Sequence, residues 1–193
     1  MNGFNVANFL KGLEALVTGD GFKRVIQGLN INSIRVAGLI PTASTEPSRE
    51  SLETSFEGLI VSSSQTALGD VTFLIPRDYD EGVDKLDLRF LVNSGGDTNT
   101  PTIDCAMYRK RAGAALSSDI DPTISAAVNN NTAKAGYVEV RSHGDGWKAG
   151  DAVTCVFTTS AHTTDDFHVY GFEAVYASDL AYYEDDERSI SDE

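Results

Sequence analysis

The chain has 193 residues, 41% of them hydrophobic, so it can bury a core without disulfides or metal ions. Its 15 Lys and Arg residues are outnumbered by 29 Asp and Glu residues, which gives a formal charge of −14. A surface of that sign repels phosphate backbones and disfavours nucleic-acid binding as the main role. Six of the acids fall in residues 184–193, which we interpret as a solvated acidic tail.

The first thirty residues carry a helical pattern, and residues 1–30 are predicted to form an N-terminal arm. Apolar residues recur at i, i+3, i+4, i+7, i+10 and i+11, and a shorter pattern follows Gly19-Asp20-Gly21. Two short helices are not stable alone, so the arm must pack on its own domain, on a second copy or on a partner. The predicted partner contacts are Val6, Phe9, Leu10, Leu13, Leu16, Val17, Phe22, Val25, Ile26 and Leu29.

From residue 31 to residue 183 the period changes to two, which is typical of half-buried strands. The strands are predicted over 34–36, 56–61, 71–75, 86–92, 102–109, 137–141, 152–158 and 167–176, and residues 41–53 and 112–135 are predicted to be loops. About eight strands joined by Gly, Asn and Asp turns, without a repeating β-α unit, predict a mainly β protein. The expected fold is an antiparallel β-sandwich of the jelly-roll type.

The two cysteines, Cys105 and Cys155, each lie in an alternating apolar stretch and are predicted to be buried core residues. A single disulfide between them is left open. The N-terminus lacks the basic region of a signal peptide, and no stretch approaches the ~18 apolar residues of a membrane span. We therefore expect folding in a cytoplasm and no membrane partner.

Side chains that could carry chemistry form two clusters. His162 and His168 flank Asp165 and Asp166, but the spacing matches no zinc signature. A second cluster could hold calcium in a loop or hydrolyse glycosides, but it lacks the EF-hand spacing. No nucleophile elbow and no phosphate-binding loop occurs, so no catalytic residue, metal ligand or cofactor is predicted, and the chain is not expected to be an enzyme. The members of the second cluster are Asp78, Asp80, Glu81 and Asp84.

Two further features could contact a partner. The only tryptophan, Trp147, lies in a glycine-rich loop, where it either stacks on a sugar as the candidate ligand contact or covers the end of the sandwich. Tyr79 is the other aromatic residue considered for a sugar site. The basic cluster Tyr108-Arg-Lys-Arg111 is interpreted as a solvated strand end or as a contact with an acidic neighbouring subunit.

Several strings resemble β-rich virion proteins of tailed bacteriophages: Phe73-Leu-Ile-Pro-Arg-Asp-Tyr-Asp80, Leu86-Asp-Leu-Arg-Phe90, Tyr108-Arg-Lys-Arg-Ala-Gly-Ala-Ala-Leu116 and His162-Thr-Thr-Asp-Asp-Phe-His-Val-Tyr170. The resemblance covers residues 70–183. It implies a capsid cement (decoration) protein on the virion surface, a homotrimer that clamps neighbouring major capsid protein subunits and uses an N-terminal arm for part of the contact. The alternative is a carbohydrate- or receptor-binding module of a phage fibre or tail component.

Overall fold

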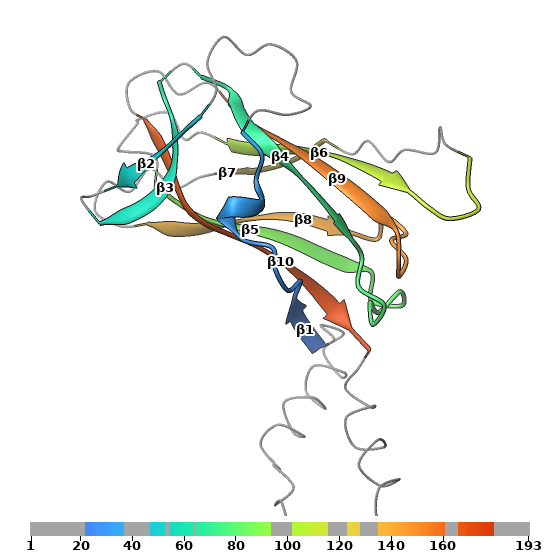
Figure 1. Cartoon of the computed structure of the whole chain (residues 1–193). Coiled ribbons are helices and arrows are strands. Elements are labelled where there is room, and N and C mark those ends of the chain that lie inside the picture. Colours follow the sequence, from blue (N-terminus) through green and yellow to red (C-terminus); the bar gives the residue numbers. More distant parts are fainter. Residues whose placement is uncertain are drawn as a thin grey trace, which may run out of the picture.

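The computed structural model describes residues 22–36, 47–52, 55–63, 65–93, 102–115, 123–127, 135–160 and 166–179. They form two antiparallel sheets that face each other (Figure 1). The predicted helix that contains Val6, Phe9, Leu10, Leu13, Leu16 and Val17 lies outside the described residues, as do the acidic tail and two of the four residues of the His162–His168 cluster, His162 and Asp165.

The first sheet has the strand order β2-β3-β10-β5-β8, and β1 pairs with β10 beside that path. Its strands are β1 (Phe22–Val25), β2 (Ser48–Leu52), β3 (Phe56–Val61), β5 (Lys85–Asn93), β8 (Gly136–His143) and β10 (Phe167–Ser178). The second sheet has the order β4-β9-β6-β7, with β4 (Ala67–Leu74), β6 (Thr102–Lys110), β7 (Thr123–Ala127) and β9 (Ala152–Thr159). The predicted mainly β, antiparallel sandwich is confirmed. The finer jelly-roll assignment stays a prediction.

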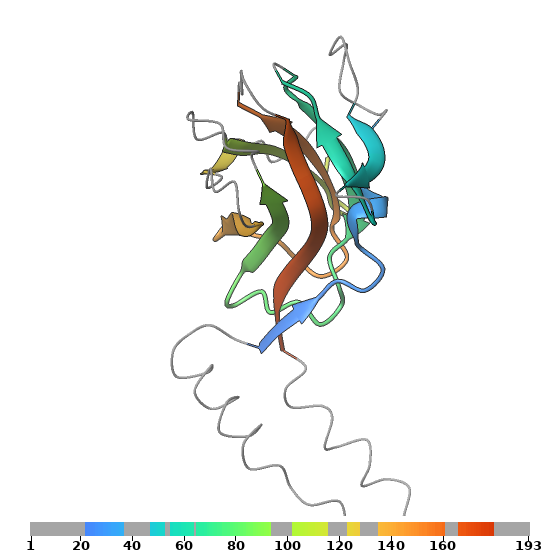
Figure 2. The ribbon, with the colours of Figure 1, turned by 90° about the vertical axis from the view of Figure 1, so that its left-hand side faces the viewer.

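Every connection between consecutive strands from β3 to β10 crosses between the sheets, except the one from β6 to β7. Neighbours within a sheet are therefore distant in sequence, as in the pairing of β5 with β10. At one end of the molecule Phe22 of β1 lies opposite Ser178 of β10, so the chain enters and leaves the sandwich side by side (Figures 1 and 2).

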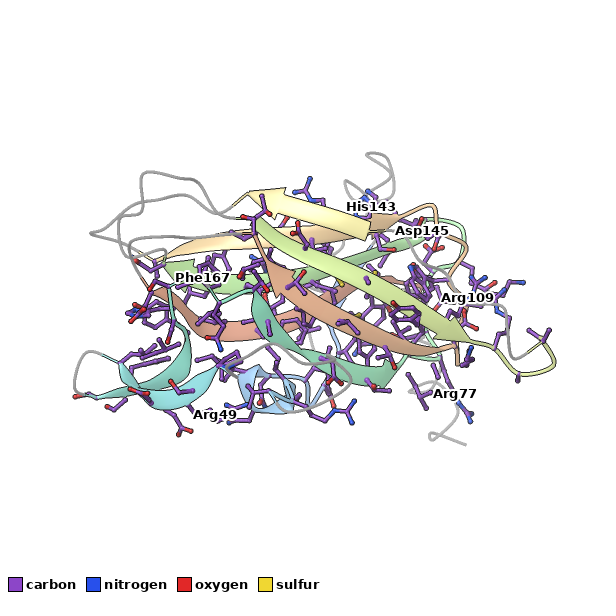
Figure 3. The ribbon with its side chains drawn as sticks, turned by 90° about the horizontal axis from the view of Figure 1, so that it is seen from above. Arg49, Arg77, Arg109, His143, Asp145 and Phe167 are labelled. Carbon is purple, nitrogen blue, oxygen red and sulfur yellow. The ribbon has the colours of Figure 1, made fainter. Side chains whose placement is uncertain are left out.

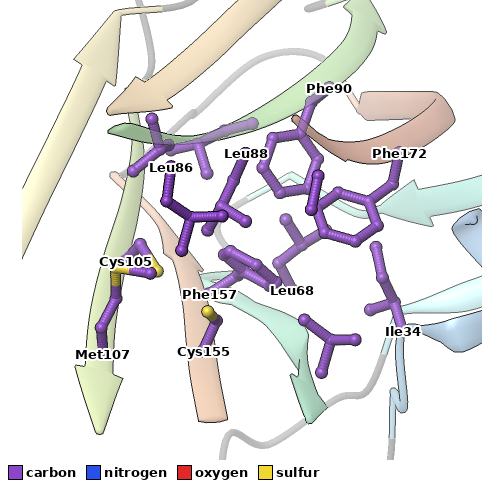
Figure 4. Close-up of a cluster of buried hydrophobic side chains, with 14 of the residues drawn as sticks. Ile34, Leu68, Leu86, Leu88, Phe90, Cys105, Met107, Cys155, Phe157 and Phe172 are labelled. Atoms are coloured by element: carbon purple, nitrogen blue, oxygen red, sulfur yellow. The ribbon is translucent and has the colours of Figure 1, made fainter. Parts of the chain in front are cut away.

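The core lies between the sheets and follows the predicted alternation. Leu86, Leu88 and Phe90 of β5 point inward and are fully buried (Figure 4). Phe90 contacts Phe157 of the opposite sheet at a centroid distance of 5.0 Å, and both rings contact Phe172 of β10. Edge-to-face and tilted contacts of this kind add to the hydrophobic burial that joins the two layers.

The two cysteines belong to this core. Cys105 on β6 and Cys155 on β9 are both buried and free, so the prediction of buried core residues is confirmed. Burial raises the pKa of the Cys155 thiol well above its ordinary value, which keeps the group protonated. Among the described residues no helix is long and apolar enough to cross a membrane.

The helix predicted over residues 22–29 is wrong, because Phe22–Val25 form strand β1 along the end of β10. The β-branched pair Val25-Ile26 favours an extended chain, and Gly28, with φ +83°, forms the turn that follows. Ile26 is buried in the core and Leu29 packs against it. These two side chains therefore serve the chain's own sandwich.

Strands β2 and β7 lie within the two predicted loops, and both are edge strands: among the described strands β2 pairs only with β3, and β7 only with β6. Their sequences, Ser-Arg-Glu-Ser-Leu and Thr-Ile-Ser-Ala-Ala, lack the apolar alternation of a strand with one buried face. The strand predicted over 34–36 is a single bridge between Arg35 and Asp70. Strands β2 and β7 are extended because their backbones bond to a neighbouring strand, and their sequences carry no alternation that would have predicted it.

Candidate functional site

Trp147 closes the end of the sandwich and presents no ring face to a ligand, because it is only 1% exposed. Its indole Nε1 donates a hydrogen bond of 2.7 Å to Oγ of Ser142, and its backbone N donates one of 3.1 Å to Oδ1 of Asp84. This burial contradicts the hypothesis that Trp147 stacks on a sugar and agrees with the alternative, that it covers the end of the sandwich. Tyr79 is 2% exposed, and its hydroxyl donates to Asp84 at 2.9 Å, so the second aromatic candidate is buried as well.

Two arginines of the basic cluster at the end of β6, Arg109 and Arg111, hold the Trp147 loop, whereas Tyr108 and Lys110 are exposed. Nη1 of Arg109 donates to the carbonyl oxygen of Gly146 at 2.8 Å, and the guanidinium lies 5.8 Å from the Trp147 ring centroid. Arg111 donates two hydrogen bonds, of 2.8 and 2.6 Å, to the buried carboxylate of Asp151. Figure 3 places Arg109 and Asp145 toward the same end of the molecule, away from Phe167.

The acidic residues of the loop after β4 also accept hydrogen bonds from the protein. Asp84 accepts from Tyr79 and from two backbone N–H groups, and Asp80 accepts from the backbone N–H groups of Gly82 and Val83. No group of three or more metal-ligating side chains occurs within the described residues. Asp80 and Asp84 are therefore hydrogen-bonded to the loops around them in this structure.

Asp78 connects β1 and β10 at the end of the sandwich where β1 begins and β10 ends. Tyr176 and Ser178 of β10 donate to its carboxylate at 2.9 and 2.7 Å, and Nη1 of Arg24 from β1 lies 3.3 Å away. Burial alone would raise the pKa of Asp78, but the Ser178 and Tyr176 hydroxyls, together with Arg24, leave it lowered. Burial and the Asp78 carboxylate raise the pKa of Tyr176 to about 12.

Acidic pH is expected to weaken the contacts of Asp78 and so to destabilise this end of the sandwich. A carboxyl whose pKa is lowered by folding stabilises the folded state above its ordinary pKa of 3.8, and that stabilisation is lost as the pH falls through the folded value. Asp78→Asn should therefore lower Tm at neutral pH, and the gap to the wild type should close below pH 3.8. Thermal scans from neutral pH to strongly acidic pH measure the gap. A gap that does not change with pH would contradict this role of the Asp78 charge.

Aromatic side chains reach solvent on the outer face of the first sheet. The strand register places Tyr137 of β8, Leu91 of β5 and Gly171 of β10 side by side in one row. The next row holds Glu139, Arg89 and Glu173 on the same strands. Cross-strand partners share a face, and this face is opposite to the one that buries Phe90.

Tyr137 is 63% exposed, yet its ring is held in place. The guanidinium carbon of Arg89 lies 4.7 Å from the ring centroid. Arg89 is itself fixed by Glu173 at 2.6 Å and by Glu139 at 3.0 Å from Nε, although Nε is not aligned for a hydrogen bond to that oxygen. The contact with Glu139 is therefore an ion pair only, and the two carboxylates and the ring together orient the cation.

A second aromatic group lies on the same face, over β3 and β10. Phe56 is 49% exposed and contacts the ring of Tyr170 at 5.8 Å, and Tyr170 contacts His168 at 6.1 Å. A bulge in β10 between Val169 and Gly171 interrupts the register, so Tyr170 and Gly171 both belong to the outer face.

Gly171, which has no side chain, stands between the two aromatic groups. A Cβ atom added there would lie 3.7 Å from Cβ of Leu91, which is ordinary contact, so the fold does not require glycine at this position on steric grounds. Tyr137 and Tyr170 are separated by two strand spacings, or about 10 Å. We call Tyr137, Leu91, Gly171, Tyr170 and Phe56 the aromatic face.

The strand of Tyr137 was predicted, and its alternation already points Val138 and Val140 inward and Tyr137 and Glu139 outward. That pattern is the signal that could have identified Tyr137. The sequence does not give the pairing of β8 with β5 and of β5 with β10, so it could not place Tyr137 beside Gly171 and Tyr170.

No protein-family model matches the chain, and no curated protein matches it. Among solved structures, the C-terminal family 6 carbohydrate-binding module of a marine laminarinase from Zobellia galactanivorans has 11% identity and a TM-score of 0.46, with 80% of this chain and 99% of that chain covered. The family 22 xylan-binding domain from Paenibacillus barcinonensis has 8% identity and a TM-score of 0.43, with 81% and 86% covered.

The chain is also similar to the family 22 module joined to a xylanase module from Clostridium thermocellum, with 15% identity and a TM-score of 0.41. It covers 67% of this chain but only 23% of that one, so the chain spans about a quarter of that protein. Likeness at this level of identity and overlap assigns no family, ligand or residue role. The function proposed next is derived from the geometry of the chain itself.

Proposed function

We propose that the chain is a non-catalytic binding protein that takes a carbohydrate on the aromatic face, as the carbohydrate- or receptor-binding module of a larger particle or fibre. The observation that carries the proposal is the pair of solvent-facing aromatic groups on one sheet, Tyr137 on one side of Gly171 and Tyr170 with Phe56 on the other. Sugar rings present C–H faces that stack on aromatic rings and hydroxyl groups that bond to carboxylates and guanidinium groups.

The scaffold suits this role because the rings are already ordered. Tyr137 rests on Arg89, which two carboxylates hold, and Phe56 rests on Tyr170. Binding to side chains that are already fixed loses less conformational entropy than binding to free ones. The two groups stand on the paired strands β3, β10, β5 and β8, so their spacing is held by backbone hydrogen bonds.

Tyr137→Ala is expected to weaken glycan binding by about tenfold or more without changing Tm, because an exposed ring contributes to the ligand and little to the core. A glycan array identifies the ligand of the wild type, and calorimetry then measures its affinity for the variant. The matched control is Tyr108→Ala, on β6 of the other sheet, where the tyrosine is 37% exposed and belongs to no aromatic pair named above. Equal affinity of the two variants would contradict the proposed site.

Gly171→Leu tests the same face from its middle. A Cβ atom at this position meets Leu91 at ordinary contact and belongs to the outer face, so the fold is expected to stay intact. The substitution places a large side chain between the two aromatic groups and should block a ligand that spans them. Retained binding in this variant would confine the ligand to one group.

A second candidate function is that of a capsid decoration protein, a homotrimer bound to the major capsid protein on the virion surface. The observation in its favour is that the start of β1 and the end of β10 lie side by side at one end of the sandwich. A sandwich held through the segments before residue 22 and after residue 179 would project from the particle that holds it. The two functions are compatible, because a projecting sandwich would leave its aromatic face free for a glycan.

Two truncations test this second function. Deleting residues 1–21 should leave the stability of the sandwich unchanged but abolish attachment to the particle. Deleting residues 1–30 should also destabilise the sandwich, because it removes β1, the buried Ile26 and the Arg24–Asp78 ion pair. Urea unfolding and co-sedimentation with capsids measure the two effects, and light scattering tests for the trimer. Attachment of the shorter deletion at wild-type occupancy would exclude the arm as the anchor.

A further inference from the structure

We infer that the aromatic face selects uncharged sugars and rejects glycans that carry carboxylate or sulfate groups, an inference that rests on the proposed carbohydrate-binding function. The charged side chains around the aromatic rings are the basis for this choice of ligand class. Specificity is a difference of affinities, and charges that oppose one class of ligand create such a difference as well as contacts that favour another.

Two arginines on this face are paired with carboxylates: Arg89, which contacts Tyr137, and Arg141, two rows further along β8. Arg89 lies 2.6 Å from Glu173 and 3.0 Å from Glu139. Arg141 donates to the second oxygen of Glu139 at 2.7 Å. Arg141 is 63% exposed, but its Nε and Nη2 both donate to Glu139, so an anionic sugar would meet a cation that a carboxylate already neutralises.

The next row continues the pairing. The imidazole Nε2 of His143 lies 2.6 Å from Oδ1 of Asp87, and Asp87 lies opposite Arg141 in the strand register. Lys85, opposite His143 at the end of β5, also has an interaction partner. An anionic ligand would have to displace a carboxylate from its cation, and the displaced carboxylate would then repel the ligand at short range.

Glu139 stays ionised within this network. The hydrogen bond from Arg141 lowers its pKa, burial opposes the change, and Arg89 and Lys23 lower it further. A formal charge of −14 on the whole chain adds a long-range repulsion for polyanions. The hydroxyl groups of an uncharged sugar face no such cost, since a carboxylate oxygen can accept a further hydrogen bond while it stays paired with its cation, and the sugar rings stack on Tyr137 and Tyr170.

The test compares the affinity of the full chain for neutral and acidic oligosaccharides of matched length. The neutral probes are oligomers of glucose, mannose and galactose, and the acidic probe is oligogalacturonate. The wild type is expected to bind at least one neutral series and to bind oligogalacturonate about tenfold more weakly or worse, by calorimetry at low salt, where attraction to an anion would be strongest. The double variant Glu139→Gln, Glu173→Gln releases both arginines and should gain affinity for oligogalacturonate, with Tyr108→Ala as the unrelated surface control.

The outcomes separate the inference from the function on which it rests. Binding of neither class overturns the proposed function and the inference together. Binding of oligogalacturonate at least as tightly as the neutral sugars overturns the inference alone. A wild-type preference for neutral sugars that the double variant does not relax also overturns it, because the ion pairs would then not be the cause. Circular dichroism shows whether the double variant is folded, and each single variant repeats the test where the double one is not.

Discussion

Replacement of Trp147 by alanine is expected to lower the free energy of unfolding by about 3–5 kcal/mol, the range seen for large aromatic side chains in cores. The ring is among the largest fully buried side chains of the protein. The substitution also removes the donor to Ser142, whose hydroxyl in turn bonds to Asp145. A cavity and a broken polar chain would open together at the same end of the sandwich.

Urea unfolding followed by circular dichroism is the right measurement, because Trp147 is the only tryptophan and its fluorescence disappears with it. Trp147→Phe keeps most of the ring volume and loses the indole donor, so it should cost less than Trp147→Ala and remain folded. Tyr137→Ala, on an exposed ring, should change stability by about 0.5 kcal/mol or less. If Trp147→Ala kept full stability and lost the ligand, the assignment of the two aromatic residues would have to be exchanged.

Gly69→Ala is expected to lower the free energy of unfolding by about 3 kcal/mol, from backbone strain and overpacking combined. Gly69 has φ +148°, where side-chain-bearing residues are rarely found. A Cβ atom there would lie 2.5 Å from Cγ2 of Ile34 and 2.7 Å from the carbonyl oxygen of Arg35. The second of these is backbone and cannot turn away.

The clash would separate Arg35 from β4. Arg35 and Asp70 exchange backbone hydrogen bonds of 2.8 and 3.0 Å, and the Arg35 guanidinium pairs with the buried Asp70 carboxylate. Losing the cation beside a buried carboxylate adds to the cost. Gly136→Ala is the control, because a Cβ atom there has nothing within 4 Å. Thermal unfolding of both variants measures the difference, and equal Tm values would show that the β4 edge can shift to accept the methyl group.

The sequence by itself determined the fold class and most of the core. Period-two alternation identified β5, β6, β8, β9 and β10 and the inward residues such as Phe90 and Cys155, because a strand with one buried face must alternate. It failed where another chain segment supplies the stabilisation. Val25 and Ile26 fit a helical stripe equally well, and only the pairing of β1 with β10 makes their segment a strand. The edge strands β2 and β7 carry no apolar pattern for the same reason.

The candidate site depended on tertiary structure almost entirely. Composition and spacing pointed to Trp147 and Tyr79, since conspicuous aromatic residues in loops are the natural candidates, but both side chains are buried in the folded chain. The aromatic face joins Phe56, Leu91, Tyr137, Tyr170 and Gly171, residues that stand up to 115 positions apart and meet only through the strand order β3-β10-β5-β8. Alternation tells which side of a strand a residue occupies, whereas strand order decides which residues share that side as neighbours.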